Sequence, residues 1–201
     1  LFREIQEKES LSPEEQDWVD SNIVNISWKT RQFDSYITEI QKQYSTEATS
    51  ERAWKIFRAY SKAGYWKEAS SWAKQSIQEH GKTGRWAGSR KLRARANMLA
   101  GNYDQAAEIW ASMWGEEAKF YAAFSSYMNK EYEAAIVAFR SLQRSKAWDA
   151  AACYWLGRAL DKLERDSTEA YELAKEKDSS GWYALLIDQH PPENAHLGTW
   201  I

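Results

Sequence analysis

The sequence predicts an all-α protein built as an α-solenoid of stacked antiparallel helical hairpins. Ala, Glu, Lys, Gln and Leu are abundant, and all of them are good helix formers. The chain has only 9 Gly and 3 Pro among 201 residues, so the usual turn residues of a β-rich fold are scarce. A short turn motif also recurs along the middle of the chain.

Composition limits the classes of function. Lys and Arg total 27 against 29 Asp and Glu, which gives a net charge of -2 and argues against a nucleic-acid partner. No run of roughly 20 apolar residues is present, so no membrane span is expected. The chain contains 12 Trp, 11 Tyr and 6 Phe. Each buried aromatic side chain removes about 150–250 Å² from water, so most of the Trp are expected in the core.

Helix signals begin near the N-terminus. Ser12 can accept a hydrogen bond from the first turn, Pro13 suits the first helical position, and Glu15 can reach back to the cap. A second helix is expected from about Trp28 to Tyr44. Ser50 is the expected cap of a third helix.

One pattern occurs three times, at 64–69, 101–106 and 130–135. A turn residue, Gly64, Gly101 or Lys130, is followed two positions later by an aromatic residue and then, after three more, by Ala. An apolar stripe continues from that Ala at spacings of 3, 4 and 7, which is typical of an amphipathic helix. The aromatic residues are Trp66, Tyr103 and Tyr132, and the Ala residues are Ala69, Ala106 and Ala135.

The spacing between copies predicts a continuous stack. It is 37 and then 29 residues, near the 34 of tetratricopeptide repeats, which these degenerate copies resemble. A fourth pair is expected at 151–163 and 168–177. A hairpin cannot bury its apolar stripe alone, so we expect one superhelix over 1–190, about five hairpins with the best repeats at 50–165. Pro191 and Pro192 then begin a tail or linker over 191–201.

A second resemblance lies in the C-terminal third. The segment 152–160 reads A-C-Y-W-L-G-R-A-L, and 181–186 reads G-W-Y-A-L-L. Their order and separation resemble the superhelical region of soluble lytic transglycosylases, best over 147–189. The chain departs from the family pattern at Leu156, Gly157 and Ile187.

The resemblance implies a periplasmic scaffold that positions or binds peptidoglycan for an adjoining lysozyme-like catalytic domain. In that family the catalytic Glu precedes a Ser, whereas the one Glu-Ser pair here is Glu9-Ser10, far from the expected position. No catalytic residue is therefore carried over, and no enzyme is expected in this chain. The alternative is a free-standing tetratricopeptide-like adaptor that binds a protein partner.

Other chemistry has little support in the sequence. His80, His190 and His196 lack the spacing of metal ligands, and no phosphate-binding Gly loop is present. Cys153 is alone and lies in an apolar segment, which favours a buried structural thiol. We expect no catalytic residue, no metal and no cofactor.

The best binding candidate is a basic run around Trp86. Arg90 and Arg93 are three residues apart, so on a helix they share a face and can grip a carboxylate. An exposed Trp86 would stack on a sugar ring. The alternatives are a solvated face, or pairing with acidic residues near the N-terminus. The run comprises Lys82, Arg85, Arg90, Lys91, Arg93 and Arg95; the acidic residues are Glu4, Glu7, Glu9, Glu14 and Glu15.

Overall fold

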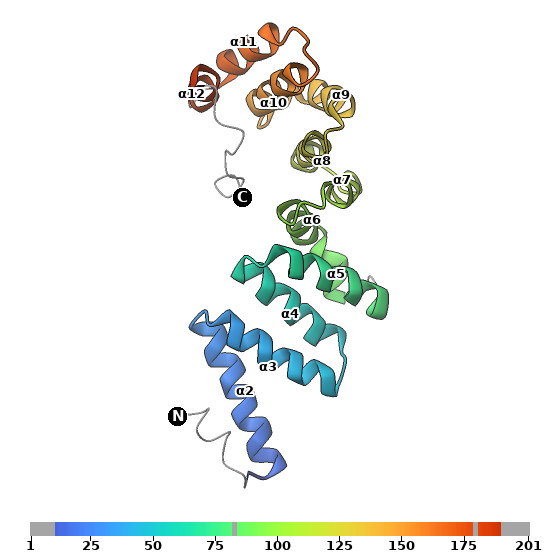
Figure 1. Cartoon of the computed structure of the whole chain (residues 1–201), viewed down its shortest axis with the longest axis vertical. Helices are drawn as coiled ribbons and strands as arrows, with labels where there is room; N and C mark the ends of the chain where they lie inside the picture. The colour runs from blue at the N-terminus through green and yellow to red at the C-terminus, as the bar shows by residue number, and fades with distance from the viewer. Residues whose placement is uncertain (1–10, 82–83, 179–180, 190–201) are drawn as a thin grey trace. The chain divides into compact units, whose positions relative to one another are not determined.

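The computed structural model describes residues 11–81, 84–178 and 181–189, and these ranges contain helices and turns without a strand (Figure 1). The chain divides into two compact units, Leu1–Ser89 and Arg90–Ile201, which we call unit 1 and unit 2. The predicted all-α fold of stacked hairpins is confirmed within each unit.

Unit 1 contains two helical hairpins and a short 3-10 helix. The first hairpin pairs α2 with α3, the second pairs α4 with α5, and α3 also packs against α4. The 3-10 helix η1 then packs against α4. The bounds are α2 Pro13–Lys29, α3 Phe33–Thr46, α4 Ser50–Ala63, α5 Trp66–His80 and η1 Gly84–Ser89.

Unit 2 continues the same plan with three hairpins and a last helix. Helix α6 pairs with α7, α8 with α9, and α10 with α11, while α12 contacts both α10 and α11. Successive hairpins contact each other through α7 and α8 and through α9 and α10. The bounds are α6 Arg90–Leu99, α7 Tyr103–Ala111, α8 Glu116–Met128, α9 Tyr132–Leu142, α10 Asp149–Asp161, α11 Thr168–Lys177 and α12 Trp182–Gln189.

The three predicted turns share one backbone geometry. The φ angle is 82° at Gly64, 83° at Gly101 and 65° at Lys130, all in the left-handed region. In each case the N–H of the next residue donates to the carbonyl five positions earlier, the bond that closes a Schellman cap. The following helices α5, α7 and α9 begin at the predicted aromatic residue. The turn-aromatic-Ala motif is therefore confirmed.

A fourth copy of this turn lies between α2 and α3. Arg31 has a φ of 58°, the N–H of Gln32 donates to the carbonyl of Ser27 at 2.8 Å, and α3 begins at Phe33. The predicted start of the second helix at Trp28 is wrong, because α2 continues to Lys29 before the chain turns. An Arg in the left-handed position hid the motif, since Gly is the usual residue there.

The predicted helix ends agree closely with the structure. The Ser12 Oγ accepts from the N–H of Glu15 at 3.3 Å, and the Glu15 carboxylate accepts from the N–H of Ser12 at 2.9 Å. The third helix is capped by Thr49, one residue before the predicted Ser50. The predicted bounds 168–177 of α11 are confirmed, and α10 lies two residues earlier than predicted.

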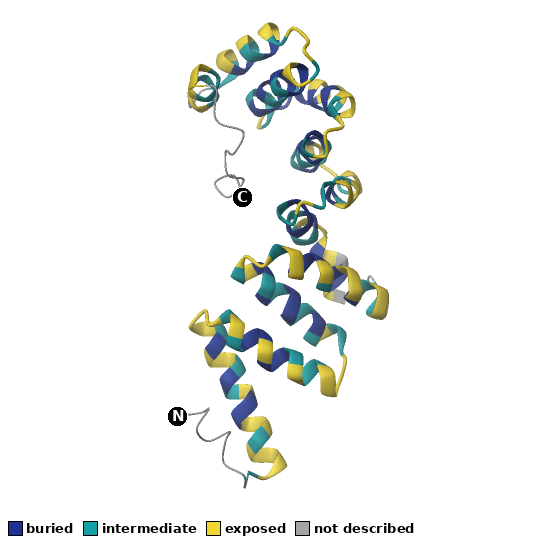
Figure 2. Cartoon of the chain, in the orientation of Figure 1, coloured by how far each residue is buried: buried dark blue, intermediate teal, exposed yellow. Residues whose placement is uncertain are grey.

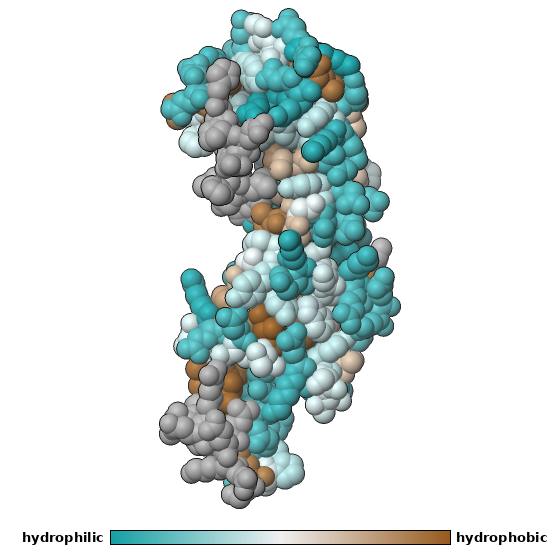
Figure 3. Space-filling model, viewed as in Figure 1, coloured by the Kyte–Doolittle hydropathy of each residue, from teal (hydrophilic) through white to brown (hydrophobic). Residues whose placement is uncertain are grey.

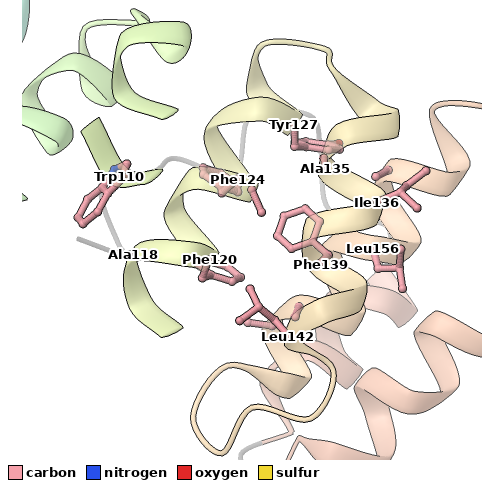
Figure 4. Close-up of a cluster of buried hydrophobic side chains, with 14 of the residues drawn as sticks. Trp110, Ala118, Phe120, Phe124, Tyr127, Ala135, Ile136, Phe139, Leu142 and Leu156 are labelled. Carbon is pink, nitrogen blue, oxygen red and sulfur yellow. The ribbon is translucent and has the colours of Figure 1, made fainter. Parts of the chain in front are cut away.

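The repeated Ala residues are buried between the helices. Ala69, Ala106 and Ala135 are all 0% exposed, and each of the helices α2 to α11 carries buried residues, whereas α12 has none (Figure 2). Large rings fill the space around these positions in unit 2, where Phe120, Phe124 and Phe139 lie in one cluster (Figure 4). The prediction that most of the Trp lie in the core is confirmed only in part: Trp86 and Trp110 are buried, whereas Trp18, Trp114 and Trp182 are exposed and the other described Trp are half-buried.

Two organisational predictions remain open. The prediction of one superhelix over 1–190 depends on how the two units join, and it stays a prediction. The predicted tail at 191–201, with Pro191 and Pro192, lies outside the described residues.

The close contact at Gly157 gives a first prediction. A methyl group at Gly157 in α10 would lie 2.6 Å from Cε1 of Tyr171, whose hydroxyl donates to Asp161. We expect Gly157→Ala to lower the free energy of unfolding by about 1–3 kcal/mol, because the anchored ring must move. Urea denaturation measures this change.

Gly88→Ala is the matched control. A methyl group at Gly88 meets no atom within 4 Å and its φ is ordinary, so stability should stay unchanged or rise by up to about 1 kcal/mol. Equal losses in the two variants would contradict the packing of α10 against α11.

Candidate functional site

The structure places Trp86 in the core of unit 1. Its side chain is 0% exposed, its ring lies 5.4 Å from that of Phe57, and it meets Trp54 edge-on at 5.2 Å. The prediction that Trp86 is exposed and stacks on a sugar is therefore wrong. The physical reason is the 3-10 turn η1, which packs on α4 and brings this indole against the rings there.

Arg90 and Arg93 lie in the first turn of α6. Arg90 is exposed and Arg93 is half-buried. Burial lowers the pKa of Arg93, and the positive charge of Arg90 lowers it further, so the two guanidinium groups lie near each other. Trp86 belongs to unit 1, so the structure fixes only the two arginines relative to each other. Their role in ligand binding stays a prediction.

The basic run does not form one free patch. The Arg85 Nε lies 2.8 Å from a Glu51 carboxylate oxygen, and the Lys91 Nζ lies 2.6 Å from one of Glu117. These acids come from α4 and α8, not from the N-terminal residues weighed above. Lys82 lies outside the described residues.

Unit 1 carries a groove with a volume of about 190 Å³. Helices α2, α3 and α4 and the 3-10 helix η1 form its wall. Most of the lining residues come from α2 and α4, the first helices of the two hairpins. In Figure 3, small apolar areas on unit 1 alternate with larger hydrophilic ones. The lining residues are Val24, Asn25 and Trp28 of α2, Tyr36 of α3, Glu51, Trp54, Lys55 and Arg58 of α4, and Arg85 of η1.

Aromatic rings form one wall of this groove. The Trp28 ring lies 5.1 Å from that of Tyr36, and the Arg58 Cζ lies 5.2 Å from the Trp28 ring centroid. That distance is within the range of a cation–π interaction, which holds the guanidinium over the indole. Trp54 is half-buried and is backed by Trp86. The rings are thus held in place before any ligand arrives.

The groove has more positive than negative charge. Lys55, Arg58 and Arg85 line it together with one carboxylate, that of Glu51, which pairs with Arg85. Among the described residues, no carboxylate pairs with Lys55 or Arg58. Burial raises the pKa of Tyr36, and this effect outweighs the positive charge of Arg58, which lowers the pKa. The hydroxyl therefore stays protonated at neutral pH.

Sequence reasoning missed this groove. Its residues come from four elements separated along the chain, and only the fold brings them together. Trp28 and Trp54 were expected in the core, where large rings usually lie. The local signal in the sequence is Arg58, which follows the aromatic Phe57. A long cationic side chain next to a core residue extends its charged group to the surface, where it can meet a ligand.

The remaining candidate reactive side chains, His80 and Cys153, pack within the fold. His80 ends α5, and its Nε2 lies 3.0 Å from the Tyr44 hydroxyl. Cys153 is fully buried, and burial raises the pKa of its thiol. No cluster of His, Cys, Asp and Glu suited to a metal ion occurs in the described ranges. Within the same ranges, no helix is both long and apolar enough to span a membrane.

Solved structures with a similar fold are helical repeat proteins. A MamA structure matches with a TM-score of 0.62 and 17% identity, covering 82% of this chain and 92% of that one. The C-terminal part of a TPR repeat-containing protein from Cytophaga hutchinsonii gives 0.58 and 16%, covering 94% and 75%. A putative kinesin light chain from Podosopora anserina with TPR-like repeats gives 0.54 and 15%, covering 80% and 96%.

These likenesses show a tetratricopeptide-like helical repeat fold. No family model and no curated protein matches the sequence. The C-terminal motifs that resemble lytic transglycosylases do form a packed unit, in which the Tyr154 and Tyr183 rings lie 5.3 Å apart. None of the three structures above is described as a transglycosylase, so that family membership stays a prediction.

Measurements of stability can test the contrast between the buried Trp86 and the exposed Trp114. Trp86→Ala should lower the free energy of unfolding by about 3–5 kcal/mol, because it leaves a cavity beside Phe57. Trp114→Ala should change it by less than about 0.5 kcal/mol, because Trp114 is 99% exposed. Thermal or urea unfolding of both variants gives the comparison. A small loss for Trp86→Ala would show that this ring is not part of the core.

Proposed function

We propose that the chain is a non-catalytic, tetratricopeptide-like scaffold that binds a protein partner. The observation that carries this proposal is the groove of unit 1, with its fixed rings and its excess of positive charge. At about 190 Å³ it is smaller than the roughly 300–1,000 Å³ of pockets that enclose small ligands. A site of this size suits one or two side chains of a longer partner.

The chemistry of the lining supports the same proposal. Trp, Tyr and Arg are enriched at protein interfaces, and they dominate the residues that contribute most to binding. Trp28, Tyr36 and Arg58 provide that combination on neighbouring helices. The tetratricopeptide-like fold adds a rigid frame of packed hairpins that presents them.

A peptidoglycan scaffold is the other function considered. It rests on the resemblance of 147–189 to lytic transglycosylases, as does the expected periplasmic location. The residues proposed to hold the glycan do not support it, because Trp86 is buried and cannot stack on a sugar. The hypothesis of a protein-binding adaptor is therefore the better supported of the two.

Partner identification followed by reconstitution tests the proposed function. The immobilised chain is used to isolate proteins from its source cells, and the candidates are purified and titrated by calorimetry. We expect at least one purified protein to bind with saturation. In parallel, the chain should not cosediment with purified peptidoglycan.

A titration with soluble muropeptides completes this test. We expect the same weak, unsaturated response from the wild-type chain and from the Arg90→Ala/Arg93→Ala variant. Saturable muropeptide binding that this variant loses, together with no protein partner, would contradict the proposed function and favour a peptidoglycan scaffold.

A further inference from the structure

We propose that the groove of unit 1 binds an acidic peptide segment in which a carboxylate side chain neighbours an apolar one. This inference rests on the proposed function and names the chemistry of its partner. It follows from the charges, the rings and the size of the groove.

The charges leave two cations for a ligand. Glu51 neutralises Arg85, whereas Lys55 and Arg58 have no carboxylate partner within the described residues. An incoming carboxylate would pair with both across a half-buried surface, where a charge-assisted hydrogen bond is stronger than a neutral one. The groove therefore selects for negative charge in what it binds.

The position of Arg58 also favours a carboxylate. Its Cζ lies over the Trp28 ring, 5.2 Å from the ring centroid. A guanidinium carries its N–H donors in a planar fork that can make two parallel bonds to a carboxylate, and the structure shows no carboxylate on this one within the described residues. Because the indole restricts the side chain beforehand, less conformational entropy is lost on binding.

The rings provide the apolar part of the site. Val24 and Trp54 are half-buried on the wall, and Trp54 is held from behind by Phe57 and Trp86. Their exposed surfaces lie in the same groove as Lys55 and Arg58. An apolar side chain of a peptide would cover these surfaces while its acidic neighbour pairs with the cations.

An acidic peptide is favoured over a single-stranded nucleic acid, the other polymer that combines negative charge with rings. Nucleic-acid sites track a continuous phosphate backbone with a basic surface. This chain has a net charge of -2, and among the described lining residues only Lys55 and Arg58 lack a carboxylate partner, which is too few cations to track a phosphate backbone.

Fluorescence anisotropy tests the inference with defined probes. The first probe is a labelled nine-residue peptide that alternates Glu with Leu and Phe; the second has Gln in place of every Glu. A labelled oligothymidylate is the third. We expect saturable binding of the acidic peptide that weakens as salt is added, and at least about tenfold weaker binding of the other two.

Charge variants locate the binding site. Lys55→Gln/Arg58→Gln should weaken acidic-peptide binding at least about tenfold. Lys67→Gln/Lys74→Gln removes the same charge from exposed positions on α5 and should leave it within about twofold. Glu51→Gln should strengthen binding, because it frees Arg85, and a misfolded variant would not show such a gain.

The outcomes separate this inference from the proposed function. Equal binding of the acidic and Gln peptides, preference for the oligothymidylate, or equal affinity of both double variants would overturn the inference. If a purified protein partner still binds in any of these cases, the proposed function stands and its site lies elsewhere. If neither peptide nor protein binds, both proposals fail.

Discussion

The close approach of helices at one small residue is the constraint on which the rest of the structure depends. Ala69, Ala106 and Ala135 lie three residues into their helices and are fully buried. A larger side chain there would push the paired helices apart, and the apolar stripes would lose their contacts. The left-handed turn before each helix ends the preceding helix and reverses the chain, so the turn brings the helix that carries the Ala back against its neighbour.

The candidate site arises where unit 1 departs from the repeat at a second position. Twelve residues before the repeated Ala, the copies in unit 2 carry Ala94 and Ala123, whereas unit 1 carries Phe57. This larger ring is buried against Trp86 and Trp54. The aromatic cluster that results supports the groove wall, so the departure from the repeat provides the rigid surface that the proposed partner would contact.

The features that could be predicted from the sequence are local, whereas the site is built from residues that lie far apart along the chain. Gly64, Gly101 and Lys130, together with the Ala that follows each of them, predicted three turns because each motif spans only six residues. Arg31 concealed a fourth turn, since its left-handed backbone is set by the surrounding packing and not by residue type. Trp86 was a candidate binding residue because it lies among cations along the chain, yet the 3-10 turn directs it inward. The groove needs four elements to meet, and periodicity predicts only which face of each helix is buried.

Hydrogen–deuterium exchange with and without the acidic peptide would locate the partner site, because it reports where a ligand acts along the chain. We expect slower exchange in α2, α4 and η1 of unit 1, with unit 2 unchanged. These elements line the groove and carry its rings and charges. Slower exchange confined to unit 2, or none in α2 and α4 at saturating peptide, would contradict a partner site in this groove.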